Sequence, residues 1–480
     1  MRRTKILATL GPASESPEMV EKVILAGADV VRLNFSHGSH DEHRERARLV
    51  REVSKKHNRC VGILGDLQGP KIRTDRFVEG KVTLEQGDVF TLDAELDRDA
   101  GTKASVGITY KALPKDVNVE DYLILDDGRL VLKVTSIEGA KIHTTVEVGG
   151  LLSNNKGINR RGGGLSAPAI TEKDRADILL AAEIQVDFLA VSFPRNAADI
   201  NYARKLLREA GGTGAIVAKI ERAEIMGVID EAIEASDVIM IARGDLGVEI
   251  GDAELPAVQK ELINKSRIAN KIVITATQMM ESMIENPIPT RAEVFDVANA
   301  VMDGTDAVML SAESAAGKHP EKAIEAMGRI CETAEQHVNA KKSSHRINST
   351  FEFIDEGIAM SAMYAANHLG VKAIAAMTES GSTPLWMSRI SSAIPIYALT
   401  RNDHTSSKVT LYRGVHPMKF QTIYNSHAEA NKAVVDVLKQ SGAVEDGDLV
   451  IITKGDLMGV HGGTNAMKIV RVGELIEADT

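Results

Sequence analysis

Pairs of oppositely charged residues end two of the short apolar runs in this sequence. Lys219 and Glu221 end the run AIVAKIE, and Arg243 and Asp245 end the run DVIMIARGD. Strand residues two apart point the same way, so each pair is expected to converge on one side of its strand. Two carboxylates that meet there, Glu221 and Asp245, are hard oxygen ligands suited to Mg²⁺ or Mn²⁺.

Cations are expected around these carboxylates. Arg32 lies near the end of the run DVVRLNF, and Arg73 follows the Gly-Pro turn of GDLQGPKIRT, which also contains Asp66. A divalent metal ringed by cations needs anionic ligands, and phosphate or carboxylate would serve. Positioning and charge neutralisation are what phosphoryl transfer requires. The pattern therefore predicts a metal-assisted enzyme that handles phosphate.

Eight apolar runs alternate with helix-like stretches and must position these residues. Such continuous apolar strands are typical of a parallel sheet covered on both faces, and eight units predict a closed (β/α)₈ barrel. The runs cover residues 4–10, 29–35, 61–67, 187–193, 215–221, 237–245, 271–277 and 306–313. Active sites of such barrels lie at the C-terminal strand ends. The other polar residues at these ends are Thr9, Asn34, Ser36, Asp66, Ser192, Thr275, Thr277, Ser311 and Glu313.

The chain is expected to form three domains of an α/β protein. The barrel takes residues 1–70 and 167–337. A small β domain, barrel-like, is inserted at 71–166, where alternating polar and apolar residues with DDG turns predict antiparallel hairpins. Its end, NNKGINRRGGG, combines a glycine-rich hinge with Lys156, Arg160 and Arg161, which favours a mobile lid over the barrel mouth. An open α/β domain occupies 338–480.

Composition excludes several classes of protein. The 480 residues carry a formal net charge of −10, which argues against a protein built mainly to bind nucleic acid. No apolar run approaches the ~18 residues of a membrane span, and no export signal is recognisable at the start. Only two cysteines are present, which indicates a reducing compartment. We therefore expect a cytoplasmic protein.

The longer motifs resemble one family. The stretches VVRLNFSHGSHDEH, GDLQGPKIRT, AKIERAE and MIARGDLGVEI are similar to pyruvate kinase, and so is TATQMMESMIENPIPTRAEVFDVANAVMDGTDAVMLSAES. The similarity covers nearly the whole chain. It implies Mg²⁺-dependent transfer of phosphate from phosphoenolpyruvate to ADP, giving ATP and an enolate that is protonated to pyruvate. This is the last step of glycolysis.

The resemblance also implies roles for the strand-end residues. Arg32 and Arg73 would hold phosphoryl groups, and Lys219 would stabilise the charge of the transferring group. Glu221 and Asp245 would bind Mg²⁺. The backbone of Arg243, Gly244 and Asp245, with Thr277, would hold the substrate carboxylate, and either Thr277 or Ser311 would lie on the proton path to the enolate. The nucleotide would be contacted by Asn34, Ser36, His37, Arg73 and Lys156.

Many members of this family also need K⁺. The resemblance places that ion near Asn34, Ser36, Asp66 and the backbone of Leu67, beside a glutamate that is here Lys71. A K⁺ a few ångströms from an ammonium would be repelled, since a like-charge pair at ~4 Å costs about 4 kcal/mol at an effective dielectric of ~20. We expect Lys71 to reach toward Asp66 and to replace the ion.

A regulatory site is expected in the C-terminal domain. The loop TESGST contains Thr378, Ser380, Gly381, Ser382 and Thr383 and precedes a helix-like run, an arrangement that suits an anion. The matching loop in pyruvate kinases resembles an effector phosphate pocket. The facing loop, residues 454–465, has one lysine and one histidine but no arginine, which favours a sugar monophosphate or AMP over a bisphosphate. The family also implies a homotetramer.

Two other readings of the sequence stay open at this point. Another phosphoenolpyruvate- or pyruvate-type barrel, such as an aldolase, shares the metal carboxylates and the enolate chemistry. A catalytically inactive sugar-phosphate sensor would use only the C-terminal domain. The inserted β domain and the filled catalytic positions favour the kinase.

Overall fold

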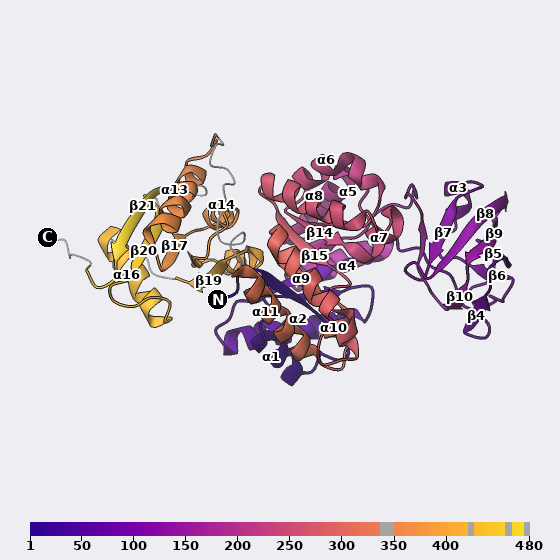
Figure 1. The fold of residues 1–480 in the computed structure, drawn as a ribbon, viewed down its shortest axis with the longest axis horizontal. Helices are drawn as coiled ribbons and strands as arrows, with labels where there is room; N and C mark the ends of the chain where they lie inside the picture. Colours follow the sequence, from indigo (N-terminus) through magenta and orange to yellow (C-terminus); the bar gives the residue numbers. More distant parts are fainter. Residues whose placement is uncertain (337–349, 421–426, 457–462, 475–480) are drawn as a thin grey trace.

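The structure is a computed structural model that describes residues 1–336, 350–420, 427–456 and 463–474. Its central body is a closed barrel of eight parallel strands (Figure 1). These strands are β1 (Lys5–Leu10), β2 (Val30–Asn34), β3 (Gly62–Asp66), β12 (Phe188–Val191), β13 (Ala215–Ile220), β14 (Val238–Ala242), β15 (Ile272–Ala276) and β16 (Ala307–Leu310). Each lies within one of the eight predicted runs, so the predicted barrel is confirmed.

Alternate side chains of each strand enter two different apolar cores. Ile6 and Ala8 of β1 pack outward with the surrounding helices, whereas Leu7 packs inside the barrel with Val30 and Leu64. This period of two follows from the pleat of a strand. Because both faces are covered, a barrel strand reads as continuously apolar, which is why the runs were visible in the sequence.

Helices with clear start signals cover the outside of the barrel. Capping boxes begin α2 (His40–Lys56), α4 (Glu172–Glu183) and α9 (Arg291–Asp303). Each cap satisfies backbone N–H groups that the first turn leaves unpaired. Further helices around the barrel are α1 (Pro17–Leu25), α5 (Ala197–Glu209), α6 (Ile229–Ala235), α7 (Arg243–Ile250), α8 (Leu255–Ile268), α10 (Ala312–Ala315) and α11 (Pro320–Glu335).

The inserted segment forms a small body with its own apolar core, at one end of the barrel (Figure 1). Its strands are β4 (Lys81–Leu84), β5 (Val89–Asp93), β6 (Ser105–Gly107), β7 (Tyr122–Leu125), β8 (Leu130–Glu138), β9 (Lys141–Val148), β10 (Gly150–Ser153) and β11 (Ile158–Arg160). They form a six-stranded sheet and a two-stranded sheet. The pairs are antiparallel as predicted, except that β5 pairs with β6 in parallel.

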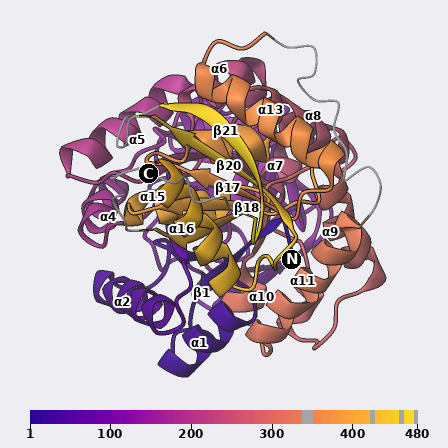
Figure 2. The same ribbon diagram turned by 90° about the vertical axis from the view of Figure 1, so that its left-hand side faces the viewer.

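The C-terminal segment is an open α/β sheet at the opposite end of the barrel (Figures 1 and 2). The sheet runs β19 (Val415–Lys419), β18 (Ile396–Thr400), β17 (Ala373–Met377), β20 (Leu449–Gly455) and β21 (Thr464–Arg471). Its helices include α13 (Ile354–Leu369), α14 (Ser382–Ser388), α15 (Asp403–Lys408) and α16 (His427–Gln440). The apolar runs VKAIAAMT, IPIYALT and DLVIITKGD in the sequence predict only the three central strands, β17, β18 and β20. The edge strands β19 and β21 are half-exposed, so their residues mix polar and apolar types.

The C-terminal domain closes the bottom of the barrel. One apolar cluster contains both barrel-interior residues such as Leu7 and Phe188 and C-terminal residues such as Leu411. A buried ion pair between Arg389 and Asp306 fixes this junction, and Arg389 Nη1 lies 3.0 Å from Asp306 Oδ2. The domain boundaries expected near residues 71, 167 and 338 stay predictions. No described helix is both long and apolar enough to span a bilayer.

Candidate active site

Asp66 is the centre of a buried charge network at the C-terminal end of β3. Arg32 Nε lies 2.7 Å from Asp66 Oδ2, and Lys219 Nζ lies 3.3 Å from Asp66 Oδ1. Lys219 Nζ also lies 2.9 Å from Glu221 Oε1 and donates a hydrogen bond of 2.7 Å to the Ser192 hydroxyl. The structure therefore brings together residues from four strand ends, as the (β/α)₈ arrangement predicted.

The network fixes the charge state of its members. Burial alone would raise the pKa of Asp66, but Lys219 and Arg32 outweigh it and hold that pKa below its usual range. Burial would likewise lower the pKa of Lys219, yet Asp66 and Glu221 raise it. Lys219 is therefore a permanent cation in a site that water hardly reaches, which is where a charge acts most strongly on a reacting group.

Glu221 and Asp245 supply the oxygen ligands that a divalent cation prefers. Burial raises the pKa of Glu221, and the nearby charge of Asp245 adds to the effect against the attraction of Lys219. A cation between these carboxylates would relieve that excess of negative charge. The backbone N–H of Phe193 donates to Glu221 Oε2 at 2.8 Å and orients it. Within the described residues, no group of three or more His, Cys, Asp or Glu is arranged to hold a metal ion by itself.

Lys71 lies elsewhere than predicted. Its ammonium lies 3.1 Å from Asp245 Oδ1, not against Asp66 as the sequence analysis expected. The physical reason is that Arg32 and Lys219 already occupy the two oxygens of the Asp66 carboxylate. Lys71 is therefore the counter-ion of a candidate metal ligand.

Arg243 is also placed differently from the expected ring of cations. Its guanidinium is buried and donates to the Thr277 and Gln278 carbonyls, at 2.8 Å each, and pairs with Asp296 at 2.7 Å. Thr277 and Gln278 have left-handed φ values of 64° and 53°. A β-branched residue at such a φ is strained, so Arg243 serves to hold this turn rather than to face the mouth.

The turn after β15 places one candidate hydroxyl beside helix α7 (Arg243–Ile250). Thr277 Oγ1 accepts a 2.8 Å hydrogen bond from Gly244 N–H and donates to the Ala276 carbonyl at 2.7 Å. The other candidate, Ser311, has a buried hydroxyl without a hydrogen-bond partner among the described residues. Both hydroxyls lie at strand ends, and the geometry does not choose between them.

The cations expected over the barrel mouth are paired within the inserted domain. Lys156 Nζ lies 2.7 Å from Asp126, and Arg160 Nε lies 2.9 Å from Asp121. The Arg161 guanidinium stacks 4.8 Å from the Tyr122 ring centroid. Each of these three cations therefore has a partner within the inserted domain. Arg73 donates to the Asn155 carbonyl at 3.0 Å, which places it at the start of this domain.

The loop after β2 contains residues that the sequence analysis expects to contact the nucleotide. Asn34 Oδ1 accepts a hydrogen bond of 3.2 Å from the backbone N–H of Ser36. Burial lowers the pKa of His37, and the positive charges of Arg73 and Arg32 lower it further. His37 is therefore mainly neutral at pH 7.

Comparison with known proteins assigns the chain. The model of the pyruvate kinase barrel domain matches residues 1–324, and that of the pyruvate kinase alpha/beta domain matches residues 356–470. The chain belongs to the pyruvate kinase family. Pyruvate kinase II of Salmonella typhimurium is 58% identical over 476 residues, 98% of this chain and 99% of the relative. The pyruvate kinases of Haemophilus influenzae and Sporosarcina psychrophila are 58% and 43% identical, over 95% and 99% of this chain and 96% and 81% of theirs.

Membership settles the activity in general terms. Pyruvate kinases transfer the phosphoryl group of phosphoenolpyruvate to ADP, and this chain is an enzyme of that kind. The family generally uses Mg²⁺ and K⁺. The aldolase and the inactive sensor are therefore set aside.

Sequence reasoning missed the residues that hold the end of the inserted domain in this pyruvate kinase. Glu249 of α7 is 5% exposed and accepts hydrogen bonds from Ala223 N–H at 2.8 Å and from Asn159 at 3.4 Å. Glu224 accepts from Gly164 N–H at 3.1 Å. A glutamate in a helical run reads as a surface charge, so the sequence held no signal for this role.

The buried Glu249 carboxyl makes the stability of the protein depend on pH, which can be tested. Burial, with the charge of Glu224 adding to it, raises the pKa of Glu249 from 4.5 to about 7, against the opposing effects of the Ala223 N–H, Asn159 and Arg222. A raised carboxyl pKa stabilises the folded state below pH 4.5 and loses that stabilisation as the pH rises through about 7. Glu249→Gln removes this ionisation. We expect the variant to gain stability over the wild type between these pH values, up to about 3 kcal/mol.

Urea unfolding across this pH range measures the difference. Glu254→Gln, at an exposed position at the start of α8, is the matched control and should follow the wild type at every pH. A constant difference between wild type and Glu249→Gln would show that Glu249 does not ionise in this range.

Proposed function

We propose that Lys219 is the residue on which phosphoryl transfer depends most. The observation that carries this proposal is the position of its ammonium, buried between Asp66 and Glu221 at the barrel mouth. Since the two carboxylates fix the ammonium in advance, no reorganisation is needed when charge develops on the transferring group. Arg32 and Arg73 would hold phosphoryl oxygens on the same side.

The metal and the substrate would meet at the ends of β13 and β14. Glu221 and Asp245 would hold Mg²⁺ or Mn²⁺, which neutralises phosphate charge when bound. The substrate carboxylate would lie against the backbone of Arg243, Gly244 and Asp245 at the start of α7, where N–H groups and the helix dipole favour an anion. Thr277 or Ser311 would deliver the proton to the enolate.

The nucleotide would lie between the barrel mouth and the inserted domain. Asn34, Ser36 and His37 would contact it from the barrel, with Arg73 beside them. Lys156 would reach the phosphates from the inserted domain after leaving Asp126, its partner in this structure. Such an exchange needs the inserted domain to close on the barrel, with the glycine-rich stretch after β11 as the hinge. The barrel would then comprise residues 1–70 and 167–337, the inserted domain residues 71–166, and the C-terminal domain residues 338–480.

Substitution of Lys219 tests the catalytic proposal. Lys219→Met should lower kcat about 100- to 1,000-fold, the usual effect of removing one preorganised charge from a transition state. The assay mixes phosphoenolpyruvate, ADP and Mg²⁺ and follows ATP and pyruvate. Lys205→Met, at a side chain that is 67% exposed on α5, is the control and should leave kcat unchanged.

Two measurements distinguish catalysis from folding. The urea midpoint of Lys219→Met shows whether the variant is folded, and Lys219→Arg retains the charge and should recover part of the activity. A folded Lys219→Met enzyme with wild-type kcat would refute the proposed role.

We further propose that Lys71 replaces the K⁺ that the family generally uses. Lys71 and Asp245 support this proposal, since their 3.1 Å pair places a fixed positive charge at the metal ligands. The candidate K⁺ ligands are Asn34, Ser36, Asp66 and the Leu67 backbone. Of these, the Leu67 carbonyl already accepts a 2.7 Å hydrogen bond from Ser192.

The ion dependence tests this proposal. The enzyme should be active with Mg²⁺ when a bulky organic cation replaces all K⁺ and Na⁺. Lys71→Glu should lose that activity and regain part of it with K⁺, because the substitution changes the local charge by two units. Lys103→Glu, an exposed position of the inserted domain, is the control for charge reversal alone. A wild-type enzyme that is inert without K⁺ would contradict the substitution.

The loop before α14 is the proposed effector site. Thr378, Ser380, Gly381, Ser382 and Thr383 gather hydroxyl and N–H groups there: Gly381 N–H donates to Thr378 Oγ1 at 2.9 Å, and the Ser380 and Ser382 hydroxyls lie 3.3 Å apart. Thr464, at the start of β21, accepts a hydrogen bond from the Thr383 hydroxyl at 2.8 Å. The histidine of the facing loop, His461, lies outside the described residues. We propose a sugar monophosphate or AMP as the activator.

Titration with ribose 5-phosphate, glucose 6-phosphate, AMP and fructose 1,6-bisphosphate identifies the activator. We expect activation by one of the first three that Ser382→Asp abolishes, because a carboxylate repels phosphate. Ser361→Asp, exposed on α13, should leave activation intact. A preference for the bisphosphate would overturn this choice of effector.

By family resemblance we also propose a cytoplasmic homotetramer. Light scattering at assay concentrations would detect a monomer, which would contradict the proposed assembly.

A further inference from the structure

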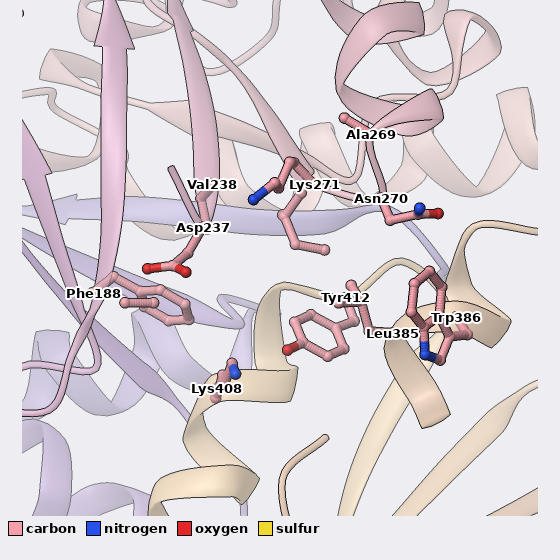
Figure 3. A pocket seen from close by; sticks show the side chains of 12 residues that line it. Phe188, Asp237, Val238, Ala269, Asn270, Lys271, Leu385, Trp386, Lys408 and Tyr412 are labelled. Carbon is pink, nitrogen blue, oxygen red and sulfur yellow. The ribbon is translucent and has the colours of Figure 1, made fainter. Parts of the chain in front are cut away.

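A cavity of about 240 Å³ lies between the bottom of the barrel and the C-terminal domain. Barrel residues at the N-terminal ends of β12, β14 and β15 form one wall, and residues of α14, α15 and the segment after it form the other (Figure 3). The cavity is therefore at the opposite end of the barrel from the active site. For comparison, a cavity of roughly 150 Å³ holds a benzene molecule.

Aromatic side chains supply much of its apolar lining. Phe188 comes from β12, Trp386 from α14, and Tyr412 from the segment after α15 (Figure 3). Phe188 and Tyr412 are 1% and 3% exposed and belong to the apolar cluster that joins the barrel to the C-terminal domain. Flat apolar walls of this kind favour a planar ring.

Two polar groups of the cavity have no partner. The Tyr412 hydroxyl accepts and donates no hydrogen bond among the described residues, although its side chain is almost completely buried. The Lys408 ammonium likewise has neither an ion pair nor a hydrogen bond within the described part of the chain. Figure 3 shows both groups on the same side of the cavity. A buried donor without an acceptor costs free energy, which a ligand oxygen would recover.

The charges around the cavity favour an anion. The carboxylate in its wall, Asp237, is already paired with Arg204 at 2.6 Å and accepts the N–H of Ile216. The Lys271 ammonium donates only to neutral carbonyls, those of Glu234 at 2.9 Å and Ser236 at 2.8 Å. Positive charge is therefore in excess. Burial lowers the pKa of Lys408, the charge of Asp237 opposes this, and Arg208 lowers the pKa further.

We propose that this cavity binds a small aromatic carboxylate. The two carboxylate oxygens would accept hydrogen bonds from Lys408 and from the Tyr412 hydroxyl, and the ring would lie among the apolar side chains of the lining. A carboxylate has two acceptor oxygens, one for each of the two unpartnered donors. The ligand would contact the barrel and the C-terminal domain together, at a position separate from the substrate, the nucleotide and the proposed effector loop.

The chain carries its own reporter for this site. Trp386 is the only tryptophan among the 480 residues, so its fluorescence in the full-length enzyme reports the cavity directly. Benzoate is the probe, excited at the red edge of tryptophan absorption where benzoate does not interfere. We expect a saturable change in fluorescence, with benzamide, the neutral analogue of the same shape, binding about tenfold more weakly or not at all.

Substitutions locate the carboxylate. Lys408→Met should weaken benzoate binding about tenfold or more, and Tyr412→Phe, which keeps the ring, about three- to tenfold. Lys372→Met, an exposed lysine of the same domain, is the matched control and should bind as the wild type does. Benzoate should also raise the thermal midpoint of the wild type but not of Lys408→Met, because a ligand stabilises the state that it binds.

Three outcomes would overturn the proposal. They are the absence of a saturable fluorescence change with benzoate, equal binding of benzoate and benzamide, and unchanged benzoate binding by Lys408→Met. The benzamide comparison uses the wild-type enzyme, so it decides even where a substitution prevents folding.

Discussion

The site depends on the two cations that share the Asp66 carboxylate. Arg32 and Lys219 approach its two oxygens from neighbouring parts of the barrel, at 2.7 and 3.3 Å. A buried charge without a partner would cost several kcal/mol, so each ion is stable only because the others are present. This one carboxylate therefore fixes the position of the two cations and keeps both of them charged. The pair of Lys71 with Asp245 follows from the same constraint, since Asp66 has no oxygen left to offer.

Backbone strain is the second constraint on the mouth of the barrel. The left-handed residues Thr277 and Gln278 re-aim the chain after β15, and the buried Arg243 guanidinium stabilises their carbonyls. The Arg243 guanidinium, which the sequence suggests as a substrate ligand, is thus bound to other groups of the protein. Its backbone, by contrast, remains at the start of α7, where N–H groups can face a carboxylate. The side chain of Arg243 therefore stabilises the turn, whereas its backbone is available to a carboxylate.

The sequence predicted the elements better than it predicted the contacts. Barrel strands are buried on both faces, so their apolar runs were visible, and the polar residues at their ends predicted the location of the site. The partners of the charged side chains were harder to predict from the sequence. Whether Lys71 reaches Asp66 or Asp245, and whether Lys156 faces the mouth or Asp126, depends on competition among neighbours that are distant in sequence. The sequence also failed to predict the half-exposed strands β19 and β21 and the burial of Glu249. The reason is related, because tertiary packing sets their burial.

The junction under the barrel has a consequence for how the chain is made. Strand β1 pairs with β16, and Lys5 donates to the carbonyl of Val415, 410 residues further along. The first strand can pair early with β2, but its other neighbour, β16, is absent until most of the polypeptide has left the ribosome. Long-range closure of this kind is slow, and unpaired strand edges are prone to aggregate while they wait. The inserted domain, whose strands pair with one another over short stretches of sequence, can fold during that delay.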